Sequence, residues 1–302
     1  MNTERRPGTD HPTPVTVVGL GLMGRVLAET FLRAGHPTTV WNRSPEKAGP
    51  LVEQGAHHAG SPRDAVAASP LVVVCVSDHA AVRELLDPLG DLLGDRVLVN
   101  LTSSTSAQAR ETAAWAARHD GTYLDGAIMA ATQAIGTAEA TLLYSGPRSA
   151  FEEHEPVLGL LGTTVHLGED HGLSSLHDVA LLGVMWGVLN GFLQGAALLG
   201  EAGVGAGAFT PFVDTLLTTV GSWLPGYARQ IDDDAFPPLD ATLDTHRAAI
   251  DHLVEENESV GVNAELPRLF LALADRAAAS GHGGSGYAAL IEQFRQPSEV
   301  RP

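Results

Sequence analysis

The sequence predicts an α/β domain, followed by a long interdomain helix and an all-α C-terminal domain. Short apolar runs rich in β-branched residues alternate with amphipathic segments up to about residue 168, which is the pattern of a parallel sheet covered by helices. A glycine-rich turn follows the first of these runs. From about residue 174 onward the apolar residues keep helical spacing, and we expect no further strand there.

The first predicted unit is a strand, a tight turn and a helix. Thr16–Val18 is a short apolar run, and Gly19, Gly21 and Gly24 follow at the G-x-G-x-x-G spacing before the amphipathic segment Arg25–Ala34. The first glycine permits the turn, the second lets the backbone approach a pyrophosphate, and the third lets helix and strand pack closely. This pattern predicts a Rossmann domain. Its expected cofactor contacts in this turn are Gly19, Leu20, Gly21, Leu22, Met23 and Gly24.

The residues after the second predicted strand, Thr38–Trp41, favour a phosphorylated cofactor. An NAD-selective site places an acidic residue there, whereas this chain has Asn42, Arg43 and Ser44, with Lys47 close behind. A guanidinium, a hydroxyl and an ammonium bind a 2′-phosphate by charge-assisted hydrogen bonds, and a carboxylate would repel it. The sequence thus predicts NADPH. In the alternative interpretation the glycines are ordinary turn residues and Arg43 is a solvated charge.

Composition and charge restrict the class of partner. The 302 residues are 44% hydrophobic, and the net charge of −18 opposes binding to nucleic acid or to an anionic membrane surface. The single cysteine, Cys75, lies within an apolar run and is predicted to be a small core residue, which fits a reducing compartment. The N-terminal segment is polar and proline-rich and does not resemble a secretory signal. We expect a cytoplasmic protein with a disordered lead-in.

Two further predicted strands, Leu71–Ser77 and Arg96–Thr102, place polar residues at the edge of the sheet that faces the cofactor. The expected contacts there are Val76, Ser77, Asn100, Thr102 and Ser103, and a loop or capping role is the alternative. Shorter strands are expected at Tyr123–Asp125, Thr141–Ser145 and Val165–Leu167. The predicted boundaries are 1–13 for the lead-in, 14–170 for the NADP-binding domain, 171–202 for the interdomain helix and 203–302 for the helical domain.

The predicted long helix, from about residue 174 to residue 200, is apolar nearly all round. Its apolar run is long enough to span a bilayer, but basic flanking residues are lacking, and this favours a helix enclosed by protein. Glycines recur at every fourth position and let another backbone approach one face. These glycines are Gly183, Gly187, Gly191 and Gly195. We favour packing against a second subunit of a homodimer, and packing within the same chain is the alternative.

The motifs GLGLMG, WNRS, VCVS and VNLTSS resemble those of the 3-hydroxyacid dehydrogenase superfamily, which includes 3-hydroxyisobutyrate and 6-phosphogluconate dehydrogenases. The family's D-A-P-V-S-G-G substrate motif is replaced here by DGAIMAA, beginning at Asp125. Its catalytic lysine, six residues after Gly172, is replaced by Asp178, and Leu181 and Leu182 stand in place of an Asn-Asn pair. Without the lysine to manage the hydroxyl proton and polar donors to hold a carboxylate, hydroxyacid oxidation is not expected.

An apolar pocket with one carboxylate suits a basic substrate, and a protonated carbon–nitrogen double bond accepts hydride without an oxyanion to stabilise. This combination resembles the imine reductases and reductive aminases, a branch of the same superfamily with Asp or Tyr at the lysine position. The resemblance implies NADPH-dependent reduction of imines, in particular cyclic imines, and it allows reductive amination as an additional activity. It also implies that Asp178 protonates or charge-pairs with the imine nitrogen. The alternative for Asp178 is a helix N-terminal residue favoured by the macrodipole.

The resemblance further implies a homodimer with active sites between one subunit's Rossmann domain and the other's helical domain. Candidates for the apolar wall around an imine or amine substrate, each also a common packing residue, are Ile128, Met129, Leu182, Met185, Trp186, Trp223 and Tyr227. We expect no metal, because His246 and His252 are six residues apart and do not share a helix face. Two other functions stay open: an NADP-dependent carbonyl or 3-hydroxyacid oxidoreductase, and a non-enzymatic NADP-binding interaction module.

Overall fold

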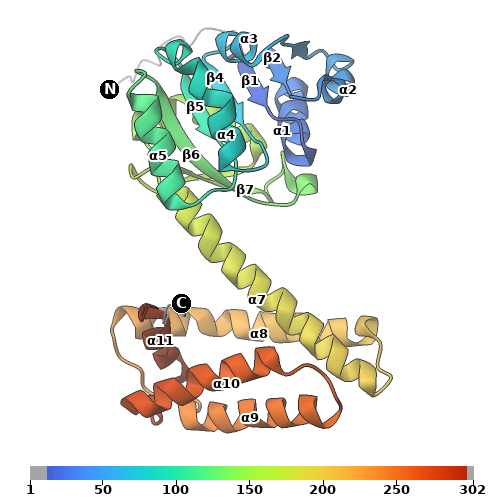
Figure 1. Ribbon diagram of the computed structural model, residues 1–302, viewed down its shortest axis with the longest axis vertical. Helices are drawn as coiled ribbons and strands as arrows, with labels where there is room; N and C mark the ends of the chain where they lie inside the picture. Colours follow the sequence, from blue (N-terminus) through green and yellow to red (C-terminus); the bar gives the residue numbers. More distant parts are fainter. Residues whose placement is uncertain (1–11, 298–302) are drawn as a thin grey trace, which may run out of the picture. The chain divides into compact units, whose positions relative to one another are not determined.

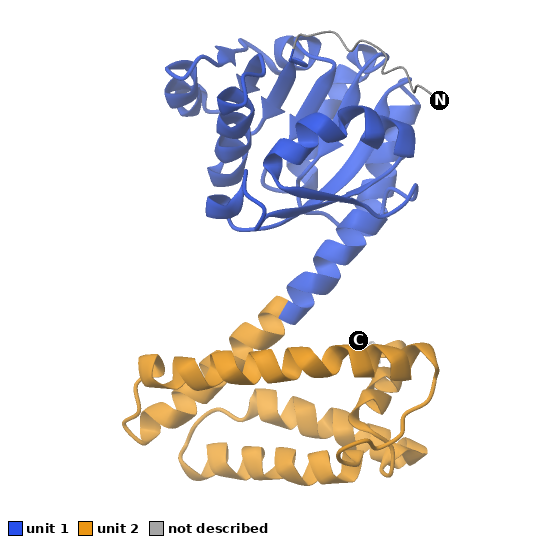
Figure 2. Ribbon diagram, turned by 180° about the vertical axis from the view of Figure 1, so that it is seen from behind, with its two compact units in different colours: residues 1–184 blue, residues 185–302 orange. Residues whose placement is uncertain are grey.

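The computed structural model describes residues 12–297, and the chain divides into two compact units (Figure 1, Figure 2). Unit 1 ends at Val184 and unit 2 begins at Met185, so the division falls inside the long helix α7 (Leu173–Glu201). Of the predicted lead-in, all but residues 12 and 13 lie outside the described residues. The predicted fold class is confirmed: a parallel α/β domain, a long helix and a helical C-terminal region follow one another along the chain.

Unit 1 is built on one eight-stranded sheet with the order β3-β2-β1-β4-β5-β6-β7-β8. The strands β1 to β6 run parallel, β7 is antiparallel to β6, and β8 is parallel to β7. The strands are β1 (Val15–Val18), β2 (Thr38–Trp41), β3 (His57–His58), β4 (Leu71–Val74), β5 (Val97–Asn100), β6 (Thr122–Met129), β7 (Thr141–Ser145) and β8 (Thr163–His166).

Helices cover both faces of this sheet. The α-helices are α1 (Leu22–Arg33), α2 (Gly49–Val52), α3 (Pro62–Ala67), α4 (His79–Leu86), α5 (Ser106–Ala117) and α6 (Arg148–Leu158). Short 3-10 turns are η1 (Pro45–Ala48), η2 (Asp87–Leu92), η3 (Thr132–Ala134) and η4 (Gly159–Leu161). Leu71 and Val73 of β4 join a core under α1, α2 and α6, while Val72 and Val74 join a second core under α3, α4 and α5. Both faces of the central strands are therefore buried, as their continuous apolar sequences require.

Some element boundaries differ from the predictions. Helix α1 begins at Leu22 rather than Arg25, because the helix starts directly after the glycine turn. Strand β6 continues past Asp125 to Met129. Its second half pairs with β7, with Gly126 opposite Tyr144, and this long-range pairing overrides the local break that an aspartate and a glycine suggest. Gly35 adopts a φ of +83° directly after α1, as expected of a helix-ending glycine.

Unit 2 is helical throughout its described residues. It contains the second half of α7, α8 (Ala206–Asp232), α9 (Leu243–Ser259), α10 (Glu265–Ala277), a π-helical turn η5 (Ala278–His282), the 3-10 turn η6 (Tyr287–Leu290) and α11 (Ile291–Arg295). Helix α8 runs through Pro211 and Pro225 and is much longer than the helical pattern of residues 212–220 indicates. Each proline removes one intrahelical hydrogen bond. Leu243, Ala274 and Leu290 form a small core under α9 and α10.

Helix α7 presents most of its apolar side chains to solvent in the described chain. Val184 is 62% exposed and Leu193 is 63% exposed. By length and composition α7 is one helix that could cross a membrane. Within unit 2 it is instead hydrogen-bonded to other helices, because Gln194 Nε2 donates to Asn257 Oδ1 at 2.5 Å. A Cβ added at Gly195 would meet the Phe209 ring at 2.9 Å, so one glycine of the predicted stripe does receive a close neighbour.

Two glycines of the G-x-G-x-x-G motif, Gly21 at the N-cap of α1 and Gly24 in its first turn, give a testable prediction. A Cβ at Gly24 would lie 1.9 Å from the carbonyl oxygen of Gly19, so Gly24→Ala forces backbone apart and is expected to lower the melting temperature by several degrees. A Cβ at Gly21 would meet nothing within 4 Å, so Gly21→Ala is expected to keep the melting temperature and to weaken NADPH binding. Thermal unfolding and NADPH titration of both variants measure these effects. Equal melting temperatures for the two variants would contradict the packing argument.

Candidate functional site

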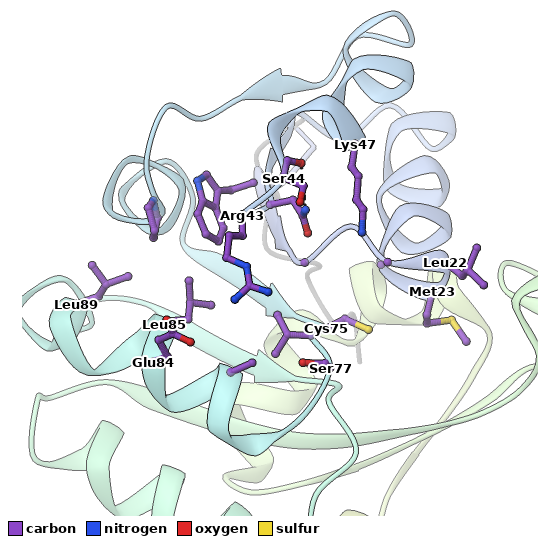
Figure 3. Close-up of a pocket in the computed structure, with 18 of the residues that line it drawn as sticks. Leu22, Met23, Arg43, Ser44, Lys47, Cys75, Ser77, Glu84, Leu85 and Leu89 are labelled. Atoms are coloured by element: carbon purple, nitrogen blue, oxygen red, sulfur yellow. Dashed lines mark hydrogen bonds between the residues drawn. The ribbon is translucent and has the colours of Figure 1, made fainter.

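Unit 1 contains a cavity of about 660 Å³ at the carboxyl ends of β1, β2 and β4. Figure 3 shows its walls, which come from the glycine turn, the residues after β2, the loop after β4 and one side of α4. Of the predicted cofactor contacts, those that line this cavity are Gly19, Gly21, Leu22, Met23, Gly24, Asn42, Arg43, Ser44, Lys47, Val76 and Ser77. The structure thus brings together most of that set.

The glycine turn lets strand, loop and helix approach within backbone contact. Gly19 has a φ of +97°, and a Cβ there would lie 2.1 Å from the carbonyl oxygen of Cys75 at the end of β4. Gly21 is the N-cap of α1 and supplies no side chain to its first N–H groups. The first turn of α1 also contains no acidic residue. The free N–H groups and the positive end of the helix dipole therefore face the cavity without competition, which suits an anion.

The basic wall follows β2 and is held in place by Asn42. Asn42 Oδ1 accepts a hydrogen bond from the Leu20 N–H at 2.9 Å, and Asn42 Nδ2 donates to the Ser44 carbonyl at 3.1 Å. Asn42 therefore ties the end of β2 to the glycine turn. Arg43 and Lys47 reach into the cavity (Figure 3), and neither forms an ion pair with any of residues 12–297. Both cations are available for a phosphate.

The opposite wall of the cavity was missed by the sequence analysis. It is formed by Trp41, Pro62, Arg63, Ala81, Glu84, Leu85, Pro88 and Leu89. Arg63 donates to both carboxylate oxygens of Asp91 at 2.8 Å, which raises the pKa of Arg63 and lowers that of Asp91. The guanidinium is thereby held in one place at the rim, and the apolar neighbours offer a surface for a flat ring. No local sequence signal marks these residues, because α3, α4 and η2 meet β2 only in the fold.

Four predicted cofactor contacts do not line the cavity. Leu20, Asn100 and Thr102 are almost fully buried, and Ser103 is exposed on the loop after β5. Thr102 Oγ1 accepts a hydrogen bond from the Val76 N–H at 3.0 Å, and Asn100 Oδ1 accepts one from the Thr102 N–H at 3.2 Å. Asn100 and Thr102 therefore hold the loop after β4 to the loop after β5. Their contact with a cofactor stays a prediction.

Cys75 lies beside the cavity and packs partly against the main core. Burial raises the pKa of its thiol to about 11. The sulfur is therefore protonated at neutral pH and does not act as a nucleophile. The Cys75 N–H donates to the Val18 carbonyl at 2.9 Å, and the Cys75 carbonyl lies where a Cβ on Gly19 would be, which explains the glycine at position 19.

Asp125 anchors the first turn of α7 to the sheet. This carboxylate on β6 is fully buried, and it accepts hydrogen bonds from Ser174 Oγ at 2.5 Å and from Ser175 Oγ at 2.6 Å. The Ser175 N–H donates at 3.2 Å and the Tyr123 hydroxyl at 2.9 Å. Ser145 Oγ adds a contact of 2.8 Å to Ser174 Oγ. A carboxylate with four donors at a helix N-terminus is a strong fixed point.

Asp178 follows on the same face of α7. Ser174, Ser175 and Asp178 are the buried residues of this helix, and Asp178 follows Ser174 by four residues and Ser175 by three, so it lies one turn further along their side of the helix. Asp178 is 5% exposed, and its carboxylate forms no hydrogen bond with any of residues 12–297. Ser104, next to the predicted cofactor loop, lies 3.1 Å from Ser175 through their hydroxyl oxygens. The chain segment beside the cofactor edge and the start of α7 are therefore in direct contact.

The predicted substrate residues divide between the two units. Ile128 and Met129 at the end of β6 are partly exposed, and Leu182 follows Asp178 by one helical turn. Trp223 and Tyr227 line one cavity of unit 2, together with His246 and Tyr287. Met185 and Trp186 are 41% and 55% exposed, and they lie outside that cavity. Within residues 12–297 no three His, Cys, Asp or Glu side chains gather as a metal site requires.

Comparison with known proteins matches both parts of the chain. Residues 14–168 match the family model of the NAD binding domain of 6-phosphogluconate dehydrogenase, and residues 170–296 match that of the NADPH-dependent reductive aminase-like C-terminal domain. The NADPH-dependent reductive aminase of Aspergillus oryzae is 36% identical over 290 residues, which cover 95% of this chain and 98% of that protein. The chain belongs to the imine reductase and reductive aminase family.

Solved structures of this family cover nearly the whole chain. A reductive aminase from Aspergillus terreus in complex with NADPH4, cyclohexanone and allyl amine is 40% identical, with a TM-score of 0.89 over 94% of this chain and 100% of that one. An imine reductase from Myxococcus stipitatus in complex with NADP+ is 37% identical, with a TM-score of 0.89 over 93% and 100%. The predicted resemblance, NADPH as the cofactor and the reduction of carbon–nitrogen double bonds are confirmed. The hydroxyacid oxidoreductase and the interaction module are not favoured.

The buried carboxylate of this imine reductase predicts a particular pH dependence of stability. Burial raises the pKa of Asp125, although the hydroxyls of Ser174, Ser175 and Tyr123 act in the opposite direction. The folded protein then binds a proton at Asp125 more readily than the unfolded chain does. The stability contribution of this group is therefore present below the ordinary aspartate pKa of about 3.9 and is lost as pH rises through the folded-state pKa.

The unaltered protein loses the stability contribution of Asp125 as pH rises from about 4 to 7, whereas an asparagine does not titrate. We therefore expect the free energy of unfolding of Asp125→Asn to rise relative to that of the unaltered protein over this range. Urea unfolding from about pH 2.5 to pH 7 measures it, because the control variant described next changes mainly below about pH 4. Asp170→Asn is the matched control with the opposite sign, since Arg110 lowers the pKa of Asp170 to about 2. The contribution of Asp170 is present above the ordinary aspartate pKa and is lost on acidification. Parallel pH profiles for the two variants would refute the assignment.

Proposed function

We propose that this chain reduces cyclic imines to amines by hydride transfer from NADPH, and that it also condenses a ketone with an amine before reducing the resulting imine. The observation that carries the proposal is Asp178, a single carboxylate without hydrogen bonds on a helix face that continues with Leu182 and Met185. Such a face favours a basic nitrogen over a carboxylate substrate. The binding of cyclohexanone and allyl amine by the Aspergillus terreus relative supports the reductive amination part.

The cofactor residues divide into three groups by chemistry. The N–H groups at the start of α1, from Leu22 to Gly24, bind the pyrophosphate. Asn42, Arg43, Ser44 and Lys47 bind the 2′-phosphate, which explains a preference for NADPH over NADH. The remaining proposed contacts are Gly19, Leu20, Gly21, Val76, Ser77, Asn100, Thr102 and Ser103, the last five near the reacting ring. When bound, NADPH supplies the hydride that reaches the imine carbon.

Asp178 provides the proton or the counter-charge. A protonated carboxyl donates its proton to the imine nitrogen, and an ionised one pairs with an iminium that is already protonated. In both cases the carbon becomes more electrophilic and no oxyanion forms. Ile128, Met129, Leu182, Met185, Trp186, Trp223 and Tyr227 form the apolar wall of the substrate site. Exclusion of water by this wall strengthens the interaction between the carboxylate and the nitrogen.

The decisive assay follows NADPH oxidation with a five- or six-membered cyclic imine. Asp178→Ala and Asp178→Asn are expected to lower kcat by about 10²- to 10⁴-fold, because the group that acts on the nitrogen is lost, while the KM for NADPH changes little. Asp170→Ala is the matched control, since its carboxylate also lies near the start of α7 but is paired with Arg110. Unchanged rates in both Asp178 variants would remove this residue from the mechanism.

We further propose that the chain is a cytoplasmic homodimer in which α7 and the adjoining helical domain, residues 203–302, form the subunit contact. The domain division at 14–170, 171–202 and 203–302 is part of this proposal. The support is the exposed apolar surface of α7 and α8, which includes Leu193 at 63% and Phe212 at 73%. Exposed apolar surface of this kind marks an interface. Each active site would then combine the Rossmann domain of one subunit with the helical domain of the other.

Leu193→Asp is expected to convert the dimer to monomers and to abolish imine reduction, because a buried unpaired charge costs several kcal/mol at an interface (~3–5 kcal/mol). Sedimentation velocity and the NADPH assay measure the two effects. Val52→Asp is the control, since Val52 is 46% exposed on α2 of the other unit, and it is expected to stay dimeric and active. A monomeric parent protein would contradict the proposal, and a protein that needs detergent would point to a membrane role for α7.

A further inference from the structure

The loop after β5, residues 101–105, is held at three points. The hydroxyl of Thr102 accepts a hydrogen bond from the loop after β4, and the side chain of Thr105 caps the start of α5. Between these two points, the hydroxyl oxygen of Ser104 lies 3.1 Å from that of Ser175 on α7. The contact between Ser104 and Ser175 is therefore a direct connection from this loop to the helix that carries the proposed catalytic carboxylate.

The hydroxyl of Ser175 has partners on two different elements. Ser175 is 2% exposed, and its Oγ donates to Asp125 Oδ2 on β6 at 2.6 Å. A serine hydroxyl has one proton and an ionised carboxylate only accepts, so the Ser175 proton goes to Asp125. The hydroxyl of Ser104 must then donate to Ser175 Oγ. The buried carboxylate thus orients Ser175 as an acceptor for the loop.

The neighbouring Ser174 shares this carboxylate but has a different second partner. Ser174 is fully buried, and its Oγ donates to Asp125 Oδ2 at 2.5 Å. Its Oγ also lies 2.8 Å from Ser145 Oγ on β7, on the side of the sheet edge away from the loop after β5. Both serines anchor α7 to the sheet, and of the two it is Ser175 that also contacts the loop.

The contact lies between two residues of the proposed site. Ser103, a proposed cofactor contact, is exposed and directly precedes Ser104, and Asp178 follows Ser175 by three residues on the same side of α7. We propose that Ser175 is a positioning residue that, through Ser104, sets the place of the bound cofactor relative to the carboxylate of Asp178. This inference rests on the proposed function for the roles of Ser103 and Asp178.

A double-mutant cycle of Ser104→Ala and Ser175→Ala tests the contact. Each single variant is expected to weaken NADPH binding in calorimetric titrations, and to slow hydride transfer to a cyclic imine at saturating NADPH, by about 2- to 10-fold, the effect of one lost hydrogen bond. Both substitutions remove the same contact, so the double variant is expected to match Ser175→Ala. Independent effects would multiply instead.

The matched control cycle combines Ser104→Ala with Ser174→Ala. Ser174 has the same type of side chain on the same helical turn and the same carboxylate partner, but it does not contact Ser104, so these two effects are expected to multiply. Ser104→Thr keeps the hydroxyl and is expected to restore both NADPH affinity and rate. Thermal unfolding checks that each variant is folded. If Ser175→Ala does not fold, the comparison of Ser104→Ala with Ser104→Thr decides, because Ser104 is partly exposed.

The outcomes separate this inference from the proposed function. Multiplying effects in the cycle of Ser104 and Ser175, or an unchanged rate of hydride transfer in Ser104→Ala, would overturn the positioning role even if imines are reduced and Asp178→Ala is inactive. A shared loss of NADPH affinity in a protein that reduces no imine would refute the proposed function and leave the connection between Ser104 and Ser175 in place.

Discussion

The contact between Asp125 and the first turn of α7 fixes the part of the molecule on which the proposed chemistry depends. A helix is rigid, so holding Ser174 and Ser175 against the sheet also fixes the direction in which residues one turn later point. The cost is visible in the raised pKa of Asp125, where burial outweighs the hydrogen bonds. Removing the carboxylate would leave the two buried serine hydroxyls without an acceptor, and an unpaired buried donor costs free energy. Asp125 therefore stabilises this position of α7, although burial of its carboxylate is itself unfavourable.

A second set of contacts joins this anchor to the cofactor edge of the sheet. The loop after β5 holds the Val76 N–H through Thr102 and touches Ser175 through Ser104. The loop after β4 in turn begins at Cys75, whose carbonyl lies against Gly19. Backbone positions at the glycine turn are therefore linked by short contacts to the start of α7. A hydride donor at the glycine turn and a proton donor on α7, as proposed above, would have to be placed relative to each other to within about an ångström, and these contacts hold the two segments together.

Local patterns in the sequence were sufficient for the parallel sheet, the glycine turn, the basic residues after β2 and α7, because each depends on neighbouring residues along the chain. They were insufficient where distant segments meet. The wall of Pro62, Leu85 and Leu89 exists only because α3, α4 and η2 pack beside β2. The hydrogen bonds by which Asn100 and Thr102 hold two loops together likewise join segments that are distant in the sequence, whereas their contact with a cofactor stays a prediction.

Two carboxylates near the start of α7 show how environment divides roles between identical groups. Asp125 has its acceptor capacity occupied by two serine hydroxyls, a backbone N–H and a tyrosine hydroxyl, so a ligand would have to displace a donor to reach it. Asp178 is nearly as buried, and none of residues 12–297 donates to it. A carboxyl in that state gains most from a partner that brings its own proton or positive charge. A basic nitrogen meets this requirement, whereas a hydroxyacid would add a second negative charge beside the first.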